Sequence, residues 1–202
     1  MAIVSPTATA FPSVNLSEWT KVLPSLPFAV LDVETTGLSP ARDRVIEIAV
    51  VRCAPDGSVI DEWSTLVDPG RDPGPTHIHG ISAADLEGAP TFEEIADQLN
   101  ERIAGALVAA HNLSFDAGFL RAEYTRAGRE VPTQSALCTL QLARVALPGI
   151  GGYSLAACAA ELGIDHPNAH RALADTRVTA SVLQAMIRRL HPSIDQDALP
   201  FG

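Results

Sequence analysis

Four acidic residues and one histidine are of the right types to carry out metal-assisted chemistry. They occur in three short segments, which read Asp32-Val33-Glu34, His111-Asn112-Leu113-Ser114-Phe115-Asp116 and His170-Arg171-Ala172-Leu173-Ala174-Asp175. Carboxylate oxygens are the ligands that hard divalent cations prefer. An imidazole beside such cations can remove the proton from an attacking water. The residue types therefore predict a site that holds two divalent cations and activates a water.

Asp32 and Glu34 lie at the end of an apolar run, Phe28–Val33, which predicts a buried strand. Side chains alternate across a strand, so residues two positions apart point to the same face. Two adjacent carboxylates repel each other and raise each other's pKa unless a cation lies between them. Taken alone, this pair also fits an ordinary strand that ends in a solvated acidic turn.

The other segments are less specific when each is taken alone. Asp116 falls in the first turn of an expected helix, where a carboxylate complements the helix dipole, and His111 ends an apolar run, as a structural histidine does. His170 and Asp175 are five residues apart, and five residues turn a helix by about 140°. They can face one site only if His170 lies in the turn before the helix and Asp175 in the helix itself. The joint order of the segments favours one common site.

Hydrophobic periodicity and turn residues indicate the elements that must position these side chains. Three apolar runs with hairpin chemistry at Pro55-Asp56-Gly57-Ser58 predict an antiparallel meander, and Thr91-Phe92-Glu93-Glu94 has the form of a capping box. Strands then alternate with helices, which favours an α/β fold with a mixed sheet and helices packed on its faces. The expected strands cover residues 28–33, 44–52, 59–67, 106–110 and 136–139, and the expected helices 91–104, 114–127, 154–162 and 170–190.

The composition limits the class of protein. The 202 residues, 47 % of them hydrophobic, can build one domain, expected over residues 27–190, between a flexible arm (1–26) and a tail (191–202). A net charge of −10 argues against broad binding to duplex DNA, although bound cations can supply local positive charge. Three widely spaced cysteines indicate reduced, buried thiols. Without a signal peptide or a long apolar span, we expect a cytoplasmic protein with no membrane contact.

The three segments together resemble the exonuclease motifs of the DEDD superfamily. The matching patterns are D-x-E-T-T-G-L from Asp32, H-N-x-x-F-D from His111 and H-R-A-x-x-D-T from His170. With His170 in place, the chain resembles the histidine-type branch (DEDDh), which includes the proofreading epsilon subunit of bacterial DNA polymerase III. The segment Thr76–Ser82 is also similar to a stretch of that family. The resemblance covers roughly residues 28–190.

The resemblance implies a ribonuclease H-like fold and 3′–5′ exonuclease activity with two Mg²⁺ or Mn²⁺ ions. It implies that Asp32, Glu34 and Asp175 hold the first ion and that Asp32 bridges to a second ion, held in part by Asp116. His170 would be the general base. In the family, residues after the acidic pair contact the terminal nucleotide. By position these are Thr35, Thr36 and Leu38, and His79 is expected to line the same cleft.

The expected substrate is the 3′ end of single-stranded or frayed DNA, released as nucleoside monophosphates, because the cleft must thread one strand. The motifs do not separate this activity from that of a 3′–5′ exoribonuclease or oligoribonuclease of the same fold. A phosphoesterase acting on small nucleotides is a further alternative. The sequence alone leaves these substrates open.

The end of the chain carries a second signal. Gln196-Asp197-Ala198-Leu199-Pro200-Phe201 is similar to the peptides with which bacterial polymerases and repair enzymes bind the sliding clamp. Weak docking of this kind raises the effective concentration of an enzyme at its substrate. One alternative function is therefore an interaction module tethered to a clamp. The other reading is a polar chain end with an incidental Leu and Phe.

Overall fold

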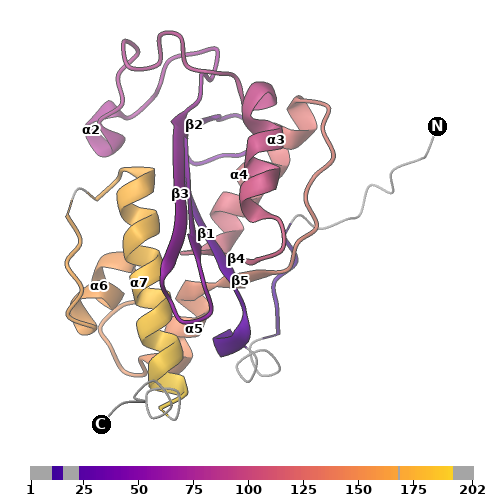
Figure 1. The fold of residues 1–202 in the computed structure, drawn as a ribbon. Helices are drawn as coiled ribbons and strands as arrows, with labels where there is room; N and C mark the ends of the chain where they lie inside the picture. The colour runs from indigo at the N-terminus through magenta and orange to yellow at the C-terminus, as the bar shows by residue number, and fades with distance from the viewer. Residues whose placement is uncertain (1–10, 16–22, 168, 193–202) are drawn as a thin grey trace.

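The computed structural model describes residues 11–15, 23–167 and 169–192 (Figure 1). A five-stranded sheet with the strand order β3-β2-β1-β4-β5 forms its centre. The first three strands pair antiparallel, as predicted, and the last two run parallel to β1. The strands are β1 (Phe28–Thr35), β2 (Val45–Cys53), β3 (Val59–Leu66), β4 (Leu107–Ala110) and β5 (Ala136–Cys138). The mixed sheet confirms the predicted fold class.

Helices cover both faces of the sheet (Figure 1). On one face lie α3 (Phe92–Ile103) and α4 (Leu113–Arg126), and on the other lie α5 (Thr139–Ala146), α6 (Leu155–Glu161) and α7 (Ala172–Leu190). Along β1, Ala29 and Leu31 pack toward α3 and α4, whereas Phe28 and Val30 pack toward α7. Because side chains alternate, Asp32 and Glu34 continue the row that faces α7.

Two helices were not predicted. A single turn, α2 (Thr76–His79), lies in the long connection between β3 and α3, and it is too short for hydrophobic periodicity to reveal. α5 begins at Thr139, directly after β5, where the sequence predicted the last residue of a strand. The Thr139 hydroxyl donates to the Ala110 carbonyl at 3.3 Å, and this contact between elements decides the boundary. A 3₁₀ turn covers Leu23–Ser25.

The expected capping box of α3 is present, with Thr91 and Glu94 bonded to each other. α7 begins at Ala172, two residues later than predicted, because His170 has a φ of 68° and cannot continue a right-handed helix. His170 therefore lies before the helix and Asp175 within it, as a common site requires.

The two ends of the chain lie partly outside the described residues. In the N-terminal arm, Phe11 is buried and Ser13 pairs with Ala136 at the edge of β5. Residues 1–10, 16–22 and the expected clamp-binding peptide Gln196–Phe201 are outside the described part. All three cysteines are free and buried, as predicted. Among the described residues, no helix has both the length and the apolar character needed to cross a membrane.

Candidate active site

Asp32 and Glu34 at the end of β1 meet Asp175 from the first turn of α7. One carboxylate oxygen of each residue lies within 4.8 Å of those of the other two. In the described part of the chain, no arginine or lysine forms an ion pair with any of the three. Carboxylate oxygens at this separation are suited to a hard divalent cation. The structure thus brings together three of the four predicted ligands.

The pKa values of these carboxyl groups show the cost of packing them without a cation. Burial first, and then the charges of Asp116 and Asp175, raise the pKa of Asp32 well above its usual value. Burial also raises the pKa of Glu34 to about 7, with a further contribution from Asp175. A cation with two positive charges would remove this penalty and displace the protons.

Asp116 is buried in the first turn of α4, where its carboxylate can also complement the helix dipole. It is 1 % exposed, and its Oδ1 has no hydrogen-bond partner. Burial raises the pKa of Asp116 to about 8, although backbone N–H groups, including that of Val33 in β1, lower it in part. Asp116 acts electrostatically on Asp32. It is therefore placed to be a fourth ligand beside the other three.

The histidine whose ring contacts this cluster is His166, which the sequence analysis did not identify. Its Nε2 lies 2.6 Å from Asp175 Oδ1, and its side chain is 14 % exposed. His170 is exposed and contacts Asp175 through its backbone, with the N–H donating to Oδ2 at 3.2 Å. No local pattern could have revealed His166, because its contact depends on how the loop before α7 folds back on the helix.

His111 has a structural environment, as its position after an apolar run allowed. Its Nδ1 is 3.0 Å from Thr139 Oγ1 and its Nε2 is 2.9 Å from the Tyr153 carbonyl. Burial lowers the pKa of His111, which favours the neutral ring. Both ring nitrogens are occupied by these contacts.

The four predicted substrate contacts differ in their availability. Leu38 is 85 % exposed and presents its side chain to solvent. Thr35 and Thr36 are buried. The Thr35 hydroxyl donates a hydrogen bond to the Gly37 carbonyl, and Thr36 Oγ1 accepts one from the Arg44 N–H. His79 is also buried, and its Nδ1 accepts a hydrogen bond from the Ile81 N–H.

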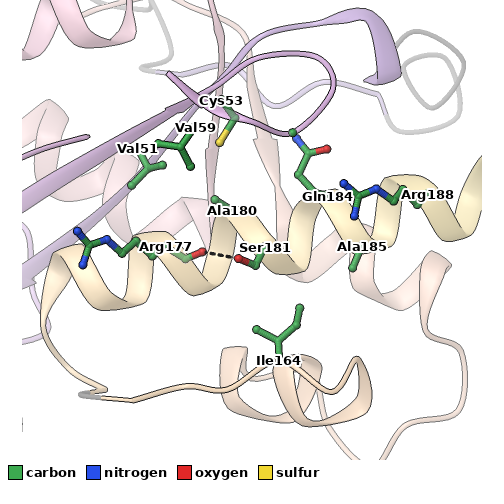
Figure 2. Close-up of a pocket in the computed structure, with 11 residues that line it drawn as sticks. Val51, Cys53, Val59, Ile164, Arg177, Ala180, Ser181, Gln184, Ala185 and Arg188 are labelled. Carbon is green, nitrogen blue, oxygen red and sulfur yellow. Dashed lines mark hydrogen bonds between the residues drawn. The ribbon is translucent and has the colours of Figure 1, made fainter. Parts of the chain in front are cut away.

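A hollow of about 470 Å³ lies beside α7, between residues of β2 and β3 and Ile164 (Figure 2). Val51 and Cys53 of β2, Ile164 and the α7 residues Arg177 and Ala180 are among its lining residues. None of the four carboxylates lines it.

Comparisons with known proteins agree with this geometry. Residues 29–183 match the RNase_T family model, which describes an exonuclease. The chain is 34 % identical over 177 residues to the 3′–5′ exonuclease DinG of Bacillus subtilis and 32 % identical over 170 residues to a PolC-type DNA polymerase III of Clostridium perfringens. These matches cover 84 % and 83 % of the chain but only 19 % and 12 % of the two relatives.

Solved structures share the fold. Escherichia coli exonuclease I in complex with a dT13 oligonucleotide superposes with a TM-score of 0.72 at 22 % identity, over 85 % of this chain and 43 % of that one. Exonuclease X in complex with 5′-overhanging duplex DNA gives a TM-score of 0.65 at 29 % identity, over 80 % and 91 %. The family match over most of the chain leads to one assignment: the chain belongs to the RNase_T exonuclease family.

Proposed function

We propose that the chain is a divalent-metal-dependent nuclease domain that shortens single-stranded or frayed DNA from its 3′ end and releases nucleoside monophosphates. The observation that carries the proposal is the convergence of Asp32, Glu34 and Asp175 within 4.8 Å, with no arginine or lysine of the described residues paired to them. The raised pKa values of Asp32 and Glu34 support it, because they mark a site that is stabilised by added positive charge.

The residues divide the work as follows. Asp32, Glu34 and Asp175 would hold one Mg²⁺ or Mn²⁺ ion, and Asp32 with Asp116 would hold a second. When bound, such a pair of ions stabilises negative charge on the attacking and leaving oxygens of an in-line displacement. His170 would accept the proton of the attacking water as the new P–O bond forms. The bond from phosphorus to the 3′ oxygen of the penultimate nucleotide breaks, and that oxygen takes up a proton from solvent to become the new 3′ hydroxyl. Its exposure and its place before α7 leave its ring free to turn toward the site.

Substrate binding is proposed at the same edge of the sheet. Leu38 would insert against the terminal bases, which its exposure supports. Thr35, Thr36 and His79 would act mainly by shaping the walls of the cleft, since their side chains are buried. The DNA preference is supported by the DNA oligonucleotides bound in the exonuclease I structures and by the polymerase relatives. RNA remains the alternative substrate, and clamp binding through Gln196–Phe201 and a cytoplasmic location stay predictions from the sequence.

The test is a gel time course with 5′-labelled single-stranded DNA and RNA of matched sequence, in Mn²⁺ or in EDTA. We expect a metal-dependent ladder that shortens from the 3′ end, faster on DNA, and no ladder with Asp175→Ala. Asp56→Asn, in the exposed turn between β2 and β3, is the matched control and should behave as wild type. A folded wild-type protein that degrades neither polymer would contradict the proposal and favour the interaction module or a smaller substrate.

A further inference from the structure

Glu47 is a buried charge in an otherwise apolar stretch of β2, and it does not belong to the motifs that define the family site. It is 4 % exposed, and it holds the residues that begin α7. Its Oε1 accepts from Arg171 Nη2 at 2.9 Å, and its Oε2 accepts from Arg171 Nε at 3.2 Å and from the Ala172 N–H at 2.9 Å. These three bonds from one carboxylate to the start of α7 are called the Glu47 clamp below.

The position of Glu47 in the sheet explains why it needs a partner. Glu47 pairs with Glu34 across the antiparallel strands β1 and β2, so the two carboxylates are direct cross-strand neighbours. Like charges directly opposite each other destabilise a sheet. Arg171 neutralises Glu47 from one side, which leaves Glu34 as the member of the pair that is open to a different cation. The ion pair therefore separates a structural carboxylate from one that is available as a ligand.

The Glu47 clamp also performs the task of a helix cap. Ala172 is the first residue of α7, and the N–H groups of a first turn have no partner within the helix. Arg171, at the capping position, makes no capping bond with its own side chain. In α6, by contrast, Ser154 caps its own helix through the Ala157 N–H. The missing cap of α7 is thus supplied by a neighbouring strand, which ties the helix start to the sheet.

The residues fixed by this contact are those on which the proposed chemistry depends. His170 directly precedes Arg171, and the Asp175 N–H donates to the Arg171 carbonyl at 3.0 Å. Asp175 in turn must reach Asp32 and Glu34, which lie on the strand next to Glu47. We propose that Glu47 is a positioning residue that, through Arg171 and the Ala172 N–H, sets Asp175 against Asp32 and Glu34 for metal binding. This inference rests on the proposed metal-dependent function.

A second arginine–glutamate pair provides a matched control. Arg177, one and a half turns further along α7, binds Glu62 of β3, with Nε to Oε1 at 2.9 Å, and so also joins α7 to the sheet. Both of its members are more exposed than those of the Arg171–Glu47 pair, and neither is a member of the Glu47 clamp or of the carboxylate cluster. Arg177 lines the hollow beside α7 (Figure 2). Loss of the Arg177–Glu62 pair therefore removes a contact between α7 and the sheet but should leave the position of Asp175 unchanged.

The experiment measures Mn²⁺ binding by isothermal titration calorimetry on the full chain, for wild type, Glu47→Gln, Arg171→Gln, the double variant and Glu62→Gln. Loss of a group that orients a metal ligand typically weakens affinity about 10–100-fold. We expect that loss for both single variants, no further loss in the double variant, and a change of less than about twofold for Glu62→Gln. Arg171→Gln keeps the test valid if Glu47→Gln does not fold, because the Arg171 side chain is half exposed.

The outcomes separate the inference from the function beneath it. Wild-type protein that binds no Mn²⁺ would defeat the proposed function itself. Wild-type binding with unchanged affinity in folded Glu47→Gln and Arg171→Gln would overturn the positioning role alone. Equal losses in these variants and in Glu62→Gln would also overturn it, since any loosening of α7 would then suffice. In nuclease assays, saturating Mn²⁺ should restore part of the activity that Glu47→Gln and Arg171→Gln lose.

Discussion

Two groups of buried carboxylates in this chain differ in how their charge is compensated. Glu123 of α4 and Glu47 of β2 each bind an arginine through two nitrogens and also accept the backbone N–H of the residue after that arginine. Asp116 is buried and Asp32 is partly buried, yet no arginine or lysine of the described residues forms an ion pair with either. We call Glu123 and Glu47 closed carboxylates, because arginines within the chain compensate their charge. We call Asp32 and Asp116 open carboxylates, because no such partner in the described part of the chain compensates theirs.

The presence or absence of an arginine partner distinguishes carboxylates that stabilise the fold from carboxylates that can still bind a cation. A buried carboxylate with a guanidinium and a backbone donor satisfies its need for partners within the chain. A buried carboxylate without a guanidinium partner holds its proton more tightly, as the pKa of about 8 for Asp116 indicates. The same residue type therefore serves structure in one region and ligand binding in the other. Removal of a member of each group should have opposite effects on stability.

The largest expected effect is the loss of activity in Asp32→Asn. Metal ions contribute several kcal/mol of transition-state stabilisation, so the loss of the ligand proposed to bridge both ions should lower kcat at least about a thousandfold. The metal-free variant should be at least as stable as wild type at pH 8, because a disfavoured buried charge is gone. Activity is measured on single-stranded DNA and stability by urea unfolding in EDTA. A variant that is both active and destabilised would contradict the open-charge assignment.

His170→Gln should lower kcat by a factor of about 100 or more, the usual contribution of a general base, while Mn²⁺ affinity stays near that of wild type. His166→Gln is the comparison variant, because His166 contacts Asp175 directly. A greater loss of kcat in His166→Gln than in His170→Gln would transfer the role of base to His166.

Glu123→Ala tests the carboxylates that are paired with an arginine. It leaves Arg44 and the Val45 N–H without their partner, and breaking a buried ion pair of this kind costs about 3 kcal/mol or more. Urea unfolding should show this loss, and Mn²⁺ affinity in the folded variant should stay unchanged. The exposed pair is the control, because Glu62→Ala should cost less than about 1 kcal/mol. A neutral Glu123→Ala would remove the contrast between the two groups.

Much of the site could be predicted from the sequence because it depends on local rules. The period of two along β1 sets Asp32 and Glu34 on one face, and the positive φ of His170 satisfies the condition set by its five-residue spacing from Asp175. Neither inference needs knowledge of distant contacts. The strand order could be predicted for the meander for the same reason, since its hairpin turn has a clear signature.

The missed features depend on distant contacts. The burial of Asp116 arises where α4 approaches β1, and the contact of His166 with Asp175 arises from a loop that folds back on α7. Glu47 carried a usable signal, because a charge in the middle of an apolar strand demands a partner. The register of β1 and β2, which sets Glu47 opposite Glu34, shows that Glu47 needs a cationic partner. It does not identify Arg171 as that partner, because this requires the position of α7.

The last and smallest effect is the pH dependence of stability in the absence of metal. The folded-state pKa values of Glu34 and Asp116 are raised to about 7 and about 8, above the values near 4 of an unfolded chain. The folded protein thus binds protons more tightly than the unfolded chain. This stabilisation is fully present below about pH 4 and is lost as the pH rises through 7 and 8. Burial lowers the pKa values of His79 and His111, and their protonation opposes this trend at lower pH, so the clearest window lies between about pH 7 and 8.5.

In EDTA, the melting temperature should therefore fall across that window, by about 4–8 °C for each 2 kcal/mol lost in a chain of this length. Asp116→Asn should flatten the slope, whereas Glu123→Ala should lower the whole curve and leave its slope unchanged. Saturating Mn²⁺ should reverse the trend in wild type, because metal binding requires the deprotonated carboxylates and gains strength as the pH rises. A metal-free melting temperature that rises from about pH 7 to 8.5 would show that the buried carboxylates find partners within the chain, and the distinction between open and closed charges would be lost.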